Sequence, residues 1–185
     1  MADNHLSRLL DGIEKMVPSA AALERAVVVE NVQVAEVLSA LNSFNEIVRY
    51  LNTRRSKGAI LQLEDEAAVQ DALFLMLRPW IPDLVPENPT QKVANRFAIK
   101  DFISTSNRFV IEAKFVRNSD HGKNITKEIN DDIETYRYHD GCDDLIFFVY
   151  DPESFIPDSQ QVSKHIQSDR IYGSKKLRCH AIIKP

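Results

Sequence analysis

The sequence predicts an α/β fold preceded by a helical extension, and three patterns support this prediction. Two runs of aromatic and β-branched residues within Arg96 to Arg117 are separated by a short polar segment, which predicts a β-hairpin. The continuous apolar run from Leu145 to Tyr150 predicts a strand that is buried on both faces. Segments with helical periodicity, at about 63–78 and 125–138, alternate with these strands.

The composition is that of one ordinary domain. The 185 residues are 44% hydrophobic and 27% charged, which is enough for a proper core. No apolar run is long enough for a transmembrane helix and no signal-peptide pattern is present, so we expect a cytoplasmic protein without a membrane partner. The two cysteines, Cys142 and Cys179, are too few for a disulfide framework and are expected to be reduced thiols. The net charge of −4 counts mildly against a nucleic-acid binder without excluding one, because local patches and bound ions matter more.

The N-terminal part predicts a short helix at 3–17 and a longer one at 20–52. In the longer helix, apolar residues recur at alternating steps of four and three, interrupted only by Glu30; these positions are Leu23, Val27, Val34, Val37, Leu41, Phe44, Val48 and Leu51. This heptad pattern is compatible with packing on the core of the same chain and with a dimerisation helix. The basic segment 53–58 predicts a linker, so we expect a helical extension at 1–57 and the main domain at 58–185.

The main domain predicts a regular order of elements. These are a helix at about 63–78, a short strand near 84–85, the hairpin, a loop at 118–122, a helix at 125–138, the buried strand, a polar helix at 159–168 and an edge strand at 176–185.

The hairpin turn fixes which residues face each other. If Ser106 and Asn107 form the turn centre, Ile103 faces Val110, because opposed residues keep a constant sum of numbers. Continuing outward, Asp101 faces Glu112, and opposed side chains in an antiparallel pair lie about 4.5–5.5 Å apart at Cβ.

Two opposed carboxylates on a largely apolar strand pair require compensating positive charge. Lys114 lies on the same face as Glu112, because side chains alternate along a strand. A divalent cation would add more charge, and carboxylate oxygens are ligands that Mg²⁺ prefers. The alternative is a structural Glu–Lys ion pair with Asp101 near the strand edge. Glu66 has two interpretations as well: a carboxylate that suits the first turn of its helix, or a further ligand of the same cluster.

Several short motifs follow one another along the main domain: Glu66-Ala-Ala-Val-Gln70-Asp-Ala-Leu73, Lys100-Asp101-Phe102, Ile111-Glu112-Ala113-Lys114, Asp132-Ile133-x-x-Tyr136 and Val149-Tyr150-Asp151-Pro152. In this order they resemble the PD-(D/E)XK nuclease superfamily, and within it the branch of the DpnII and MboI restriction enzymes. The resemblance covers about 60–185 and implies a restriction-endonuclease-like αβββαβ core, with a mixed central sheet flanked by helices. One departure is Lys100, which stands where the superfamily often has Pro.

The resemblance implies a set of roles for the site residues. Asp101 and Glu112 would hold Mg²⁺, for which Mn²⁺ can substitute, with the Ala113 carbonyl as an additional ligand. Lys114 would orient the attacking water or help to deprotonate it, and Glu66 would complete the site.

Further residues are candidates for supporting roles. Asp132, Tyr136 and Gln70 would lie behind the site or in the core. Phosphate contacts would come from basic side chains, of which the candidates are Lys92, Arg96, Lys100, Arg117, Lys123 and Lys127.

Two functional hypotheses follow. The first is a metal-dependent nuclease that hydrolyses phosphodiester bonds, of DNA rather than RNA, as an effector in anti-phage or restriction-type defence. Because the chain carries no obvious recognition domain, it would act as a dimer or with a partner protein through its N-terminal helices. The second is a catalytically silent module that binds protein or nucleic acid. The retention of Asp101, Glu112 and Lys114 together favours the enzyme.

Overall fold

The computed structural model describes residues 32–54, 58, 60–86 and 102–185. The chain divides into two compact units, Met1–Glu30 and Asn31–Pro185, and every described residue belongs to the second. The predicted helix at 3–17, the first part of the helix at 20–52, most of the linker and Asp101 lie outside the described residues.

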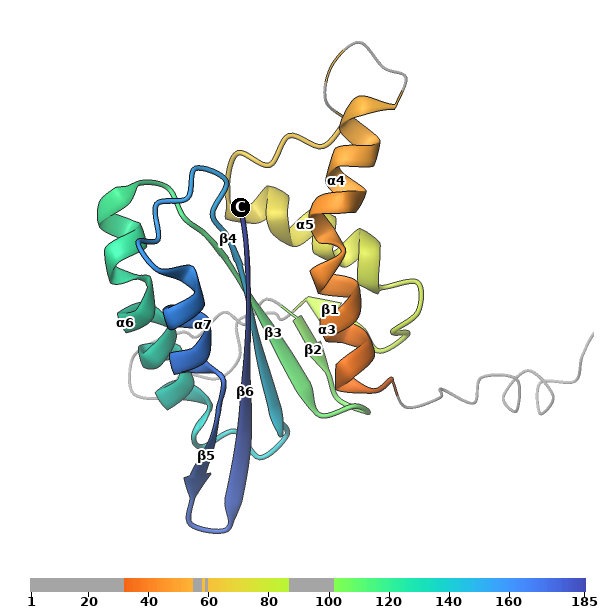
Figure 1. Cartoon of the computed structure of the whole chain (residues 1–185). Coiled ribbons are helices and arrows are strands. Elements are labelled where there is room, and N and C mark those ends of the chain that lie inside the picture. Colours follow the sequence, from red (N-terminus) through yellow and green to blue (C-terminus); the bar gives the residue numbers. More distant parts are fainter. Residues whose placement is uncertain (1–31, 55–57, 59, 87–101) are drawn as a thin grey trace, which may run out of the picture. The chain divides into compact units, whose positions relative to one another are not determined.

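A mixed six-stranded sheet forms the centre of this unit, in the order β1-β2-β3-β4-β6-β5 (Figure 1). Strands β3, β4 and β6 are parallel to one another, and the remaining neighbours are antiparallel. The strands are β1 (Leu84–Pro86), β2 (Phe102–Ser104), β3 (Phe109–Phe115), β4 (Asp144–Tyr150), β5 (Ser168–Tyr172) and β6 (Lys175–Lys184). The sheet confirms the predicted α/β class.

Helices cover both faces of the sheet, and each face has its own hydrophobic cluster (Figure 1). One face carries α3 (Val34–Asn42), α4 (Phe44–Thr53) and α5 (Glu66–Leu77); the other carries α6 (Ser119–Tyr136) and α7 (Ser159–Ile166). Because side chains alternate along β3, Ile111 and Ala113 face the first cluster, whereas Val110 faces the second. None of the helices described is long and apolar enough to cross a membrane.

The hairpin has the register that the turn residues predict. Ile103 pairs with Val110 and Phe102 with Ile111, around a turn at residues 105–108. Asp83 fixes this turn from outside the hairpin, because its carboxylate accepts hydrogen bonds from the backbone N–H and the hydroxyl of Ser106, both at 2.7 Å.

Helix α6 begins at Ser119, six residues before the predicted start, so the loop expected at 118–122 is wrong. Asn118 is the N-cap, and its side chain accepts a hydrogen bond from the backbone N–H of His121. Asn, Ser, Asp and Gly are typical of loops, but the first three also begin helices by capping the free N–H groups. The sequence pattern at 118–122 is therefore compatible with a loop and with the start of a helix, and the structure has the helix.

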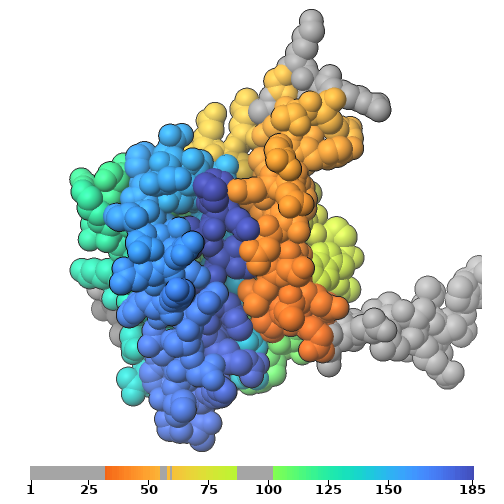
Figure 2. Space-filling view, in the orientation of Figure 1, coloured from red at the N-terminus to blue at the C-terminus, as the bar shows by residue number. Residues whose placement is uncertain are grey.

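The described part of the heptad segment forms two short helices rather than one long helix. Helix α3 ends at Asn42 and α4 begins at Phe44, with Ser43 between them. Val37, Leu41 and Phe44 are at most 1% exposed and pack in the cluster that covers the sheet. Figure 2 shows this segment, in orange, lying against the C-terminal strand in dark blue. For these three positions the structure favours packing on the chain's own core.

The C-terminal strand is not simply an edge strand. The short strand β5, which the sequence pattern did not predict, pairs with β6 from Ser168↔Cys179 to Tyr172↔Lys175. Within β6, Arg178 and Cys179 are paired on both sides, whereas residues 175–177 pair with β5 alone and residues 180–184 with β4 alone. In strand β5 two adjacent charged residues, Asp169 and Arg170, precede the apolar Ile171, a weaker signal than the apolar run of β4.

Candidate active site

Glu112 lies in the middle of β3 and is only 5% exposed. Its Oε1 atom accepts a short hydrogen bond from the hydroxyl of Tyr136, the last residue of α6. Tyr136 is itself 2% exposed and belongs to the cluster between the sheet and α6. It is therefore a core residue and also a direct partner of the predicted catalytic carboxylate.

Lys114, two residues further along β3, extends from the same face. Its Nζ lies 2.7 Å from Oδ2 of Asp132, one helical turn before Tyr136 on α6. Burial would lower the pKa of Lys114, but the charge and hydrogen bond of Asp132 outweigh it and raise this pKa above its ordinary value. The negative charges of Glu112 and Glu66 act in the same direction. Lys114 is thus held as a cation among three carboxylates.

Glu66 is the first residue of α5, which Asp65 caps through a hydrogen bond from the backbone N–H of Ala68. The Oε2 atom of Glu66 lies 3.4 Å from the backbone nitrogen of Phe115, which donates to it. Backbone groups of alternate residues point to the same edge of a strand. The Ala113 carbonyl therefore points to the edge of β3 that the Glu66 carboxylate approaches.

Asp101, the remaining predicted ligand, lies outside the described residues. The observed pair of Ile103 and Val110 has the same sum of residue numbers as Asp101 and Glu112, so the register is compatible with Asp101 opposite Glu112. Because Asp101 is not described, this opposition stays a prediction. Within the described ranges, no three His, Cys, Asp or Glu side chains are grouped so as to hold a metal ion. The oxygen donors of Glu112, Glu66 and the β3 backbone nevertheless suit a hard cation such as Mg²⁺ once Asp101 is added.

The predicted phosphate contacts are only partly described. Arg117, Lys123 and Lys127 are exposed near the start of α6, whereas Lys92, Arg96 and Lys100 lie outside the described residues. Gln70, on α5, is half-buried.

A second polar cluster, at the start of β4, was missed by sequence reasoning. Asp144 is 2% exposed and accepts a bidentate pair of hydrogen bonds from Arg178, with Nε at 2.7 Å. His180 contacts the same carboxylate at 2.8 Å. Burial would raise the pKa of Asp144, but these partners lower it to about 2. Both partners lie on β6, more than 30 residues away in sequence, so only the parallel pairing of β4 with β6 could have revealed them.

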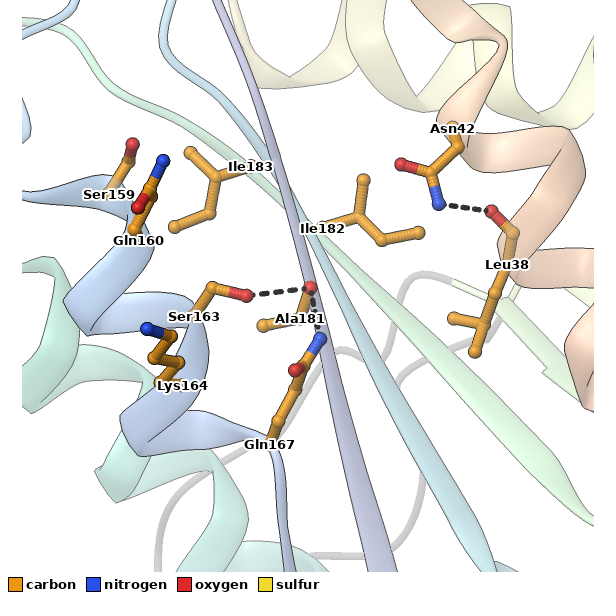
Figure 3. A pocket seen from close by; sticks show the side chains of 10 residues that line it. All are labelled: Leu38, Asn42, Ser159, Gln160, Ser163, Lys164, Gln167, Ala181, Ile182 and Ile183. Carbon is orange, nitrogen blue, oxygen red and sulfur yellow. Dashed lines mark hydrogen bonds between the residues drawn. The ribbon is translucent and has the colours of Figure 1, made fainter.

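A pocket of about 430 Å³ opens between α3 and α7, over the second half of β6 (Figure 3). The Ala181 carbonyl accepts hydrogen bonds from the Ser163 hydroxyl and the Gln167 amide, both at 3.2 Å (Figure 3). The pocket contains none of the predicted site residues. The candidate active site is therefore the side-chain group at β3, α5 and α6, and not this pocket.

A comparison with protein-family models gives a match to the DpnII-MboI restriction endonuclease model over residues 35–185. The matched range contains every predicted site residue and also the helices α3 and α4, apart from the first residue of α3. No curated protein and no solved structure matches the chain.

Proposed function

Because this chain belongs to the DpnII/MboI restriction endonuclease family, we propose that it is a metal-dependent endonuclease that hydrolyses phosphodiester bonds of DNA at Glu112 and Lys114. The family itself is one of DNA-cleaving nucleases. The observation that carries the assignment of the site is the placement of Glu112 and Lys114 on one face of β3, each with a dedicated partner on α6.

The proposed metal site combines Asp101, Glu112 and the Ala113 carbonyl, with Glu66 at the same edge of β3. A bound Mg²⁺ or Mn²⁺ would lower the pKa of a water ligand and stabilise charge on the phosphate. This oxygen-only donor set supports a hard divalent cation rather than zinc, which prefers nitrogen and sulfur.

The raised pKa of Lys114 favours the charged ammonium form of its side chain. Its raised pKa supports a role in which the ammonium group orients water and stabilises negative charge on the phosphate, rather than one as the general base. Hydrolysis joins a water oxygen to phosphorus and breaks one phosphoester bond, so charge develops on the non-bridging oxygens that a cation at this position would reach.

The biological setting is part of the proposal. Restriction-type defence would follow from the family, and the buried thiols of Cys142 and Cys179 are compatible with the reducing cytoplasm. We propose that the enzyme acts as a dimer or with a partner protein. Since Val37, Leu41 and Phe44 are buried in the core, an interface on the N-terminal helices would use other residues, such as the exposed Ile47 and Tyr50 of α4.

Nuclease assays on plasmid DNA, linear DNA and RNA, with Mg²⁺, Mn²⁺ or EDTA, test this function. We expect DNA cleavage that requires the metal and falls at least about 100-fold in Lys114→Ala and in Glu112→Gln, since each change removes a group that acts on the reacting phosphate.

The matched control variants are Lys176→Ala and Glu153→Gln, which change exposed residues with no assigned role in the site and should cleave like the wild type. Metal binding measured by calorimetry separates the outcomes. If the wild type shows no cleavage and binds no metal, the proposal is overturned and the catalytically silent module is favoured. Equal cleavage by Lys114→Ala and wild type would remove the assigned site.

A further inference from the structure

We propose that Asp132 and Tyr136 are positioning residues, through which the single helix α6 aligns Lys114 and Glu112 for the reaction. This inference rests on the proposed nuclease function and deepens it, by assigning separate tasks to two residues that do not themselves touch substrate or metal. The contacts that carry it are the Tyr136 hydroxyl on Glu112 and the Asp132 carboxylate on Lys114.

The spacing of the two contacts matches between the helix and the strand. Asp132 and Tyr136 are four residues apart, which is about 6 Å along an α-helix. Glu112 and Lys114 are two residues apart, which is about 6.6 Å along a strand. The order is reversed, because the later helix residue holds the earlier strand residue. One helix running antiparallel to β3 therefore makes both contacts at once.

Packing fixes the rotation of α6 about its axis and therefore the positions of Asp132 and Tyr136 relative to the sheet. Ile125, Ile129 and Ile133 are at most 2% exposed and form the apolar stripe of the helix against the sheet. Tyr136 continues this stripe, whereas Asp132 lies at its border and is partly exposed. A rotation that moved Asp132 away from Lys114 would expose the isoleucines.

Contacts at both ends of α6 also fix its position along its axis. Near the first turn, Gly122 lies so close to the backbone of Phe155 that an added Cβ would be 2.4 Å from the carbonyl oxygen. At the other end, Lys175 donates hydrogen bonds to the carbonyl oxygens of Tyr136, at 2.7 Å, and His139, at 2.5 Å. Sliding the helix along the sheet would break these contacts. Helix α6 is therefore a fixed support for the site.

The two residues should influence different steps. Glu112 is a proposed metal ligand, so loosening it by removing the Tyr136 hydroxyl should weaken the metal site. Lys114 is proposed to act on the water and the phosphate, so loosening it by neutralising Asp132 should slow turnover once metal is bound. Residues that orient catalytic or metal-binding groups typically contribute about 10–100-fold to metal affinity or activity.

The test measures DNA cleavage by the full chain as a function of Mg²⁺ concentration. For Tyr136→Phe we expect the half-saturating Mg²⁺ concentration to rise about tenfold, with the maximal rate within twofold of wild type. For Asp132→Asn we expect the maximal rate to fall about tenfold or more, with the half-saturating Mg²⁺ concentration within twofold. The Mg²⁺ dissociation constant measured by calorimetry should change in parallel with the half-saturating Mg²⁺ concentration.

The controls make the same chemical changes nearby. Tyr138→Phe removes a hydroxyl from a side chain that is 76% exposed, and Asp131→Asn neutralises the exposed neighbour of Asp132. Both should leave the two quantities unchanged. Loss of thermal stability alone, with both quantities at wild-type values in the folded variant, would overturn the positioning role, as would an equal change in both quantities for both variants. If the wild type neither cleaves DNA nor binds metal, the proposed function fails instead.

Discussion

Asp144 is a residue whose surroundings strongly change its acid–base behaviour. Its pKa is lowered to about 2, because hydrogen bonds from Arg178 and His180 outweigh the effect of burial. A carboxylate whose pKa is lower in the folded state stabilises the fold at any pH above its unfolded value, near 3.8. That stabilisation is lost as the pH falls from about 4 towards 2.

Asp144→Asn should therefore lower the free energy of unfolding by about 1–3 kcal/mol at pH 5, because the charged Arg178 loses its partner. The difference between wild type and variant should shrink between pH 4 and pH 2, where the wild-type carboxylate also becomes neutral. Urea denaturation at several pH values measures it. Asp169→Asn is the control, since its pair with Lys176 is half exposed and contributes little. A difference that stays constant down to pH 2 would contradict the assignment to the Asp144 charge.

At this same scale, the sequence could predict residues but not most of their partners. The placement of Glu112 and Lys114 on one face of β3 was predictable, because a short turn sets the hairpin register over a few residues. Asp132 and Tyr136 could be named as candidates, yet which strand residue each one contacts depends on the rotation of α6 over the sheet. The pairing of Asp144 with Arg178 depends on β4 and β6 being adjacent in the sheet, which no local sequence pattern encodes.

Among the elements, α6 shows how close packing can reverse an ordinary preference. Within a helix, replacing Gly by Ala usually stabilises by about 0.5–1 kcal/mol, because Ala loses less backbone entropy. At Gly122, the added Cβ would lie 2.4 Å from the carbonyl oxygen of Phe155, which is backbone and cannot rotate away. Asp151 holds that loop in place by accepting hydrogen bonds from the backbone nitrogens of Phe155 and Ile156.

Gly122→Ala is therefore expected to destabilise the protein by about 1–3 kcal/mol, the usual result of overpacking. Lys123→Ala, at an exposed neighbouring position of the same helix, should change stability by less than about 0.5 kcal/mol. Thermal and urea denaturation of the three proteins measure the effect. A stabilised Gly122→Ala protein would show that the 155–156 segment yields easily and that α6 is less firmly fixed than its contacts indicate.

The elements themselves were predictable where the pattern had one meaning. The apolar run of β4 and the described part of the hairpin, from Phe102 onward, match the expectation, since few structures other than a buried strand suit those residues. The early start of α6 was not, because Asn118 and Ser119 suit a loop as well as a helix cap. Strand β5 was missed because it obtains its stability from pairing with β6 and not from its own composition.

On the scale of the whole molecule, the segment 32–54 is tied to the rest of the unit at both ends. The backbone N–H of Val32 donates to the Asn107 side chain in the hairpin turn, at 2.8 Å. At the other end, the Asn52 side chain binds the backbone of Ile60 and Leu61, with distances of 2.8–2.9 Å. The heptad pattern could not reveal these ties, because a seam of apolar residues has the same appearance whether a sheet or a second helix covers it.

The interior of the same segment carries much of the first cluster. Phe44 packs edge-on against Phe148, with ring centroids 4.7 Å apart, and against Tyr150 at 5.8 Å. Burying each of Val37, Leu41 and Phe44 is worth about 1.5–3 kcal/mol, so together they are comparable with the 5–15 kcal/mol by which a typical domain is stable. Removing the segment would also expose the sheet face beneath it.

Two N-terminal truncations test whether the expected boundary between 1–57 and 58–185 separates an extension from a domain that folds alone. A chain that begins at residue 58 should lose cooperative unfolding and aggregate, because the sheet face with Phe148 and Ile182 would lose its cover. A chain that begins at residue 31, where the second compact unit starts, should keep a cooperative thermal transition. Circular dichroism melting with sedimentation analysis measures both. If the chain from residue 58 melts cooperatively and cleaves DNA, α3 and α4 are dispensable, and their buried residues contribute far less than their packing implies.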